Sequence, residues 1–131
     1  PTASVALDGA ALLPALGGLA LAPDEVRWTI GPGAAATLAT ADLTVTRAAS
    51  PDAPVRWRLL GPAGAALTLP TLPVGWGALH PTAGDLADVR VELIAGGTLA
   101  HAAAATGVDW EFAADTVQRS GQTAAGVTVA P

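Results

Sequence analysis

The pattern that decides the fold is VRWTI at residues 26–30, which returns as VRWRL at 55–59, VRVEL at 89–93 and VDWEF at 108–112. In each copy a branched or aromatic residue occupies every second position. Strict alternation is typical of a β-strand with one face buried and the other in water. The buried faces would carry the aromatic side chains, so we assign these to the core: Trp28, Trp57, Trp110 and Phe112.

Weaker strand-like segments lie between and around these copies, at residues 5–7, 19–21, 42–47, 67–69 and 127–129. Gly and Pro separate them at short intervals, as is typical of sandwiches and barrels. Only residues 98–106 resemble a helix, which would be so short that it depends on docking against a sheet. We therefore expect an all-β fold, a single immunoglobulin-like sandwich over residues 1–131. It would have about seven to nine mostly antiparallel strands and at most one short helix.

Composition argues against several kinds of partner and chemistry. The chain has no Cys, which excludes disulfides, thiol nucleophiles and Cys-based zinc sites. Its six basic residues are all Arg and mostly scattered, and the net charge is −5, so nucleic acid is not an expected partner. Pro and Gly interrupt the apolar runs, so no membrane span is expected. The absence of Lys, Asn, Met and Tyr, beside abundant Ala, Gly, Pro and Arg, is typical of high-GC bacteria or of viruses that infect them.

The low content of charged residues allows two interpretations. Only 13% of residues are charged, against about 25% in ordinary soluble domains. In the first interpretation the chain is an ordinary sandwich that exposes Ala, Thr, Gly and Pro. In the second it is a subunit whose outer faces are covered by its neighbours in an assembly.

The polar faces of two copies carry opposite charges. Residues 55–59 present Arg56 and Arg58, whereas residues 108–112 present Asp109 and Glu111. If the two strands are antiparallel neighbours, these side chains would pair across them, each pair contributing roughly 0.2–1 kcal/mol. The charges would then help to select the register of the strands.

The sequence offers little to support catalysis or metal binding. His80 and His101 are the only histidines and show no compact ligand spacing. Asp85 and Asp88 flank a turn but lack the carboxylate density of a calcium loop, and Thr82 with Asp85 resembles a capping pair instead. No Ser lies in a nucleophile elbow and no glycine-rich phosphate loop precedes a helix. We expect no metal, no cofactor and no enzymatic activity.

Trp76 differs from the other Trp residues because it lies between two glycines in a loop, within LPVGWGALHP at residues 72–81. It could stack on a sugar ring or insert into a partner, with His80 and Asp85 close by in sequence. The alternative, which the apolar loop favours, is that Trp76 folds back and plugs the open end of the sandwich.

The stretch from Val55 to Pro81 combines a strand containing Trp57, a Gly61-Pro62 turn and the sequence LPTLP at 69–73. It resembles segments of uncharacterised secreted proteins of high-GC bacteria with immunoglobulin-like or fibronectin-like modules. The resemblance covers about a fifth of the chain, and the Cys–Trp–Cys framework of true immunoglobulin domains is absent. It implies an extracellular or cell-envelope location and supplies no catalytic residues.

These observations lead to one expected function and two alternatives. We expect a non-catalytic surface or secreted module that makes protein contacts or supports a larger extracellular assembly. The first alternative is a structural subunit of a filament or virion, similar to a capsid decoration protein. The second is a carbohydrate-binding module that uses Trp76. The expected partner is another protein or further copies of the chain, with a glycan as a possibility.

Overall fold

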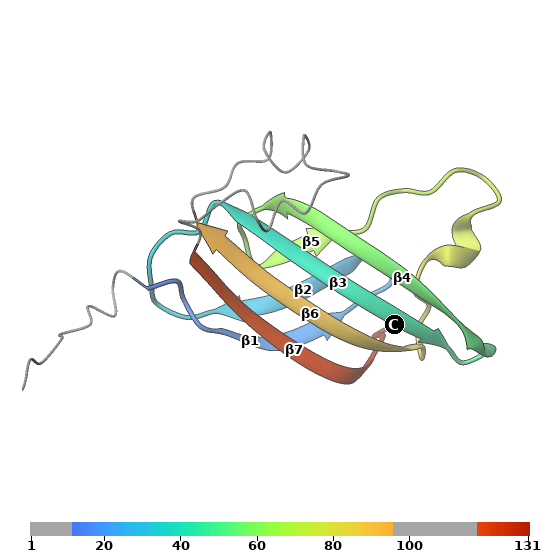
Figure 1. Cartoon of the computed structure of the whole chain (residues 1–131). Coiled ribbons are helices and arrows are strands. Elements are labelled where there is room, and N and C mark those ends of the chain that lie inside the picture. Colours follow the sequence, from blue (N-terminus) through green and yellow to red (C-terminus); the bar gives the residue numbers. More distant parts are fainter. Residues whose placement is uncertain (1–11, 96–117) are drawn as a thin grey trace, which may run out of the picture.

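The computed structural model describes residues 12–95 and 118–131. Over these residues the chain forms two antiparallel sheets packed face to face (Figure 1). The first has three strands in the order β1 (Leu16–Leu21), β2 (Glu25–Ile30) and β5 (Ala66–Thr68). The second has four strands in the order β4 (Ser50–Pro62), β3 (Leu38–Arg47), β6 (Leu86–Ala95) and β7 (Gln118–Thr128). The expected all-β sandwich is confirmed.

The strand order is immunoglobulin-like. Strands β1, β2 and β5 lie in one sheet and β3, β6 and β7 in the other, which is the division that the immunoglobulin-like sandwich makes. The fourth strand differs from the constant-type arrangement, because β4 lies beside β3 and extends the second sheet. The only helical element in the described ranges is the short 3-10 helix η2 (Gly77–Leu79).

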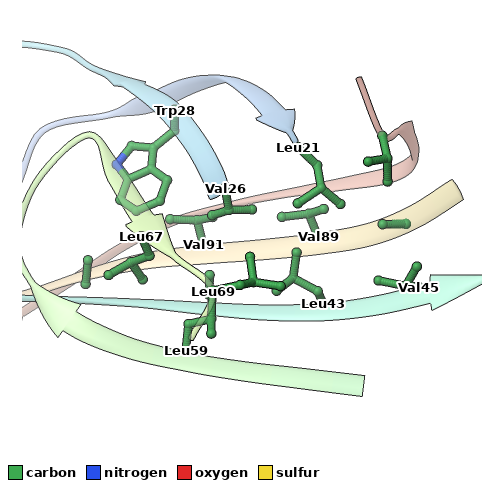
Figure 2. Packing of buried hydrophobic residues seen from close by; sticks show 14 of the residues in the cluster. Leu21, Val26, Trp28, Leu43, Val45, Leu59, Leu67, Leu69, Val89 and Val91 are labelled. Carbon is green, nitrogen blue, oxygen red and sulfur yellow. The ribbon is translucent and has the colours of Figure 1, made fainter. Parts of the chain in front are cut away.

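The core lies between the sheets and follows the alternation in the sequence (Figure 2). Val26 and Trp28 project from β2 toward Val89 and Val91 of β6, and Trp28 is only 3% exposed. Trp57 is half-buried, because it lies on β4 at the edge of the second sheet. In the absence of disulfides, this burial of branched and aromatic side chains is the main source of stability.

Ion pairs lie on the outer face of the second sheet, at the strand positions whose side chains point away from the core. Asp42 of β3 lies opposite Arg58 of β4 on one side and Arg90 of β6 on the other. The Arg58 guanidinium binds the Asp42 carboxylate at 2.7 Å, and Arg90 binds Glu92 at the same distance. These pairs are exposed on at least one side, so each contributes at most about 1 kcal/mol.

Strand β7 is much longer than the sequence pattern indicated. Alternation predicted a strand only at residues 127–129, whereas β7 begins at Gln118 and pairs with almost the whole of β6. Its first half carries Ser120, Gly121 and Gln122 in place of large apolar residues, so no period-two hydrophobic signal exists there. Pairing with an apolar neighbouring strand, rather than intrinsic propensity, holds these residues extended.

Several predicted features lie outside the described residues. They are the strands at 5–7 and 108–112, the helix at 98–106, and the side chains of His101, Asp109, Trp110, Glu111 and Phe112. The proposed pairing of Arg56 and Arg58 with Asp109 and Glu111 therefore remains a prediction.

Candidate functional site

The candidate site is the long connection between β5 and β6, which crosses from one sheet to the other at one end of the sandwich (Figure 1). The connection leaves the first sheet where the Leu69 amide donates to the carbonyl of Asp24 at 2.8 Å. It returns to the second sheet at the buried residue Pro81, shortly before β6. Between these two points the chain extends away from both sheets on the side of β4 (Figure 1), and we call residues 70–80 the apical loop.

The tip of the apical loop is a tight turn that presents two apolar side chains. The Trp76 amide donates to the Pro73 carbonyl at 3.0 Å, and Gly75 has a φ of 93°. A positive φ at the third residue is the requirement of a type II turn and favours Gly at that position. The turn places Val74 fully in solvent and leaves Trp76 59% exposed.

Trp76 therefore does not plug the end of the sandwich, and that interpretation was wrong. The loop divides its apolar residues: Leu72 and Leu79 are half-buried near its base, whereas Val74 and Trp76 point away at the tip. The 3-10 helix that follows, closed by the Leu79 amide on the Trp76 carbonyl at 2.9 Å, fixes the backbone direction at Trp76.

Two side chains tie the base of the apical loop to the sandwich. The Trp57 indole Nε1 donates to the Leu79 carbonyl at 3.1 Å, which explains why this strand residue lies at the margin of the core. The His80 ring nitrogens lie 3.2 Å from the Pro23 carbonyl oxygen and 2.9 Å from that of Pro70. The His80 ring also meets the Trp57 ring edge-on, with centroids 5.6 Å apart. The loop thus has an anchored base beneath an exposed tip.

Asp85 is a structural carboxylate that links two turns. It is 3% exposed and accepts three hydrogen bonds: from the Thr82 amide at 2.9 Å, the Thr82 hydroxyl at 2.8 Å and the Ala48 amide at 3.1 Å. Burial by itself raises the pKa of the Asp85 carboxyl, but these hydrogen bonds and the attraction of Arg47 outweigh it, so the pKa is lowered. The bonds to Thr82 are those of a capping pair, here closing a turn without a helix.

The three residues considered for glycan binding are not assembled into one ligand set. Asp85 is buried with both carboxylate oxygens engaged, and both nitrogens of His80 face backbone carbonyls. Only Trp76 presents an exposed surface. A sugar site needs hydrogen-bonding groups beside its aromatic platform, but the Asp85 oxygens are engaged within the fold and the His80 nitrogens point toward backbone carbonyls.

A second surface feature lies at the other end of the sandwich and was not found from the sequence. It is a hollow of about 280 Å³ between the two sheets, lined largely by small or apolar residues. Its walls include Pro14, Ile30, Gly31, Ala36, Ala63 and Leu93. The sequence signal for it is the run of small residues at 31–36, together with Ala63-Gly64, but their meeting depends on the topology.

Other types of site receive no support from the described residues. Over residues 12–95 and 118–131, no three His, Asp or Glu side chains are grouped as a metal would require. Within the same ranges, no helix has the length and apolar character needed to cross a membrane.

Comparisons with known proteins found no matching family model and no significantly similar curated protein or solved structure.

Proposed function

We propose that this chain is a non-catalytic binding module that docks onto another protein through the apical loop, with Trp76 as its anchor. The observation that carries the proposal is the exposure of Val74 and Trp76 at the tip of a loop whose base contacts β4 and the turn between β1 and β2. Trp is among the residues most enriched at the energetic centres of protein interfaces.

The anchored base supports this proposal on energetic grounds. Binding by a flexible loop is weakened by the ordering of its residues, about 0.5–1.5 kcal/mol for each immobilised side chain. Here the turn at Gly75, the 3-10 helix and the bonds of Leu79 and His80 already fix the backbone. A partner that covers the exposed part of the Trp76 ring would gain from the burial of apolar surface with little further loss of conformational entropy.

The composition of the loop is consistent with a protein partner. From Pro70 to Leu79 the loop contains no charged residue, and the cores of protein interfaces are depleted in charge. Glycan binding is less well supported, because His80 and Asp85 are committed to the fold.

Site-directed photo-crosslinking in cells of the source organism tests the proposal. A benzophenone amino acid at the fully exposed position of Val74 should form a discrete adduct with a protein. The same probe at the exposed position of Thr123 on β7 is the matched control and should form none. Adding Trp76→Ala to the Val74 probe should abolish the adduct. A failure to form an adduct at position 74, or an adduct unchanged by Trp76→Ala, would contradict the proposal.

A further inference from the structure

The hollow and the apical loop lie at opposite ends of the same strand. β6 begins at Leu86, shortly after the loop, and Leu93 near its end lines the hollow. The seven steps from Leu86 to Leu93, at about 3.3 Å each, separate the two features by roughly 23 Å along the sandwich. The other lining residues agree with this placement, since Ile30 ends β2 and Ala63 directly follows β4.

The hollow is large enough to receive an aromatic side chain. Pockets for drug-sized molecules usually measure about 300–1,000 Å³. An apolar cavity of about 150 Å³ is enough to bind benzene. A hollow of about 280 Å³ therefore has room for the fused two-ring system of an indole.

The two features also agree in chemistry. The lining of the hollow contains only Pro, Gly, Ala, Ile and Leu, and the loop tip contains Pro, Val, Gly and Trp. Neither side carries a charged group, so bringing them together would leave no buried charge without a partner. Ile30 in the wall of the hollow and Leu12, whose carbonyl accepts from the Ala34 amide, are exposed apolar residues that would extend the contact around Val74.

We propose that the partner of the apical loop is a second copy of this chain, with Trp76 of one molecule inserted into the hollow of the next. This inference rests on the proposed function and names the partner of that same site. Because the two surfaces differ and lie at opposite ends, the contact is heterologous and repeats from copy to copy, giving a ring or an open filament. A single inserted tip buries little area, so association is weak for one contact and increases with concentration.

Two variants separate the halves of this interface. Trp76→Ala removes the tip and leaves the hollow intact. Gly64→Leu is designed to obstruct the hollow and to leave the tip intact, because Gly64 lines the hollow and a Cβ there would meet no atom within 4 Å. Ala35→Leu is a second filling variant, since Ala35 also lines the hollow and is exposed. Circular dichroism and thermal unfolding establish that each variant is folded.

Sedimentation velocity, measured from micromolar to millimolar concentrations, reports the size of the species formed by the parent chain, by each variant and by their mixture. The parent chain should sediment faster as its concentration increases, whereas each variant alone should remain a monomer. An equimolar mixture of Trp76→Ala with Gly64→Leu should form dimers of about twice the monomer mass and nothing larger, because the mixture contains one functional tip and one functional hollow.

Three results would overturn the inference: a parent chain that stays monomeric, a Gly64→Leu or Ala35→Leu variant that still associates, or a mixture that forms no dimer. Loss of association in Trp76→Ala but not in the filled variants would indicate that loops meet each other instead. A monomeric parent that still gives a Trp76-dependent crosslink to a different protein would overturn self-association and leave the proposed function standing.

Discussion

Replacing Asp85 by Asn should reduce the free energy of unfolding by about 2 kcal/mol at neutral pH. The Asp85 carboxylate accepts three hydrogen bonds, and the residue is only 3% exposed to solvent. An Asn oxygen can replace Oδ2 and keep both bonds from Thr82. Its NH₂ group then takes the place of Oδ1 and faces the Ala48 amide, donor against donor. A lost bond to a charged acceptor costs about 1.5–3 kcal/mol, and the Ala48 N–H is left without that partner.

The effect should depend on pH in a defined direction. The pKa of Asp85 is lowered in the folded chain, so the carboxylate contributes stability above the unfolded pKa of about 3.9. That contribution is lost as the pH falls through the folded pKa. The difference in the free energy of unfolding between the parent chain and Asp85→Asn should therefore be largest at pH 7 and become smaller below about pH 4.

Urea unfolding followed by circular dichroism measures this difference, with Thr82→Ala as the matched control. Thr82→Ala removes only the hydroxyl bond to Asp85 and should cost about 1 kcal/mol, with the carboxylate left in place. A loss below about 0.5 kcal/mol for Asp85→Asn at pH 7, or a difference that grows in acid, would refute this account of Asp85.

Three further changes give distinct outcomes in the same unfolding assay. Gly75→Ala should cost about 1–2 kcal/mol, because φ at Gly75 is 93°, whereas Gly77→Ala should cost almost nothing; equal losses would disprove the type II turn argument. Trp28→Ala should cost about 3–5 kcal/mol. Trp28→Phe should cost clearly less, because the Phe ring keeps part of the packing and the substitution removes a buried indole N–H that has no partner within the described part of the chain. Similar losses for the two variants would contradict this account of Trp28. Arg58→Ala should lower the free energy of unfolding by under about 1 kcal/mol, because the ion pair with Asp42 is exposed, and the difference from the parent chain should shrink as salt is added. A cost above about 2 kcal/mol would be inconsistent with an exposed ion pair.

The sequence predicts the scaffold well where one face of a strand is apolar throughout. Residues 26–30 and 89–93 form strands as expected, since Val, Trp and Leu at alternate positions leave one way to bury them together. The start of β7 could not be predicted, because its extended conformation depends on pairing with β6 rather than on its own side chains. Local pattern therefore determines the strands that form the core, and long-range pairing determines those that border it.

The sequence locates the candidate site only in part. Trp76 was identified as the one Trp outside a strand, but its direction depends on the turn at Gly75 and on bonds to Trp57 and Pro23. These partners are distant in sequence, so no local pattern encodes them. The interpretation of Trp76 as a plug failed because the apolar character of the loop did not reveal that its base alone is buried. The hollow is likewise formed by segments that meet only after folding.

The separation of an anchored base from an exposed tip also affects how the sequence of this chain can evolve. Residues 73–77 are all exposed, and only Gly75 has a positive φ, so most substitutions at the other positions should leave folding intact. Leu79 and His80 would hold any such tip in the same position. Mutations at the tip can therefore alter what the molecule recognises at almost no cost in stability. The same property makes the apical loop a suitable place to build a library of variant binding sequences.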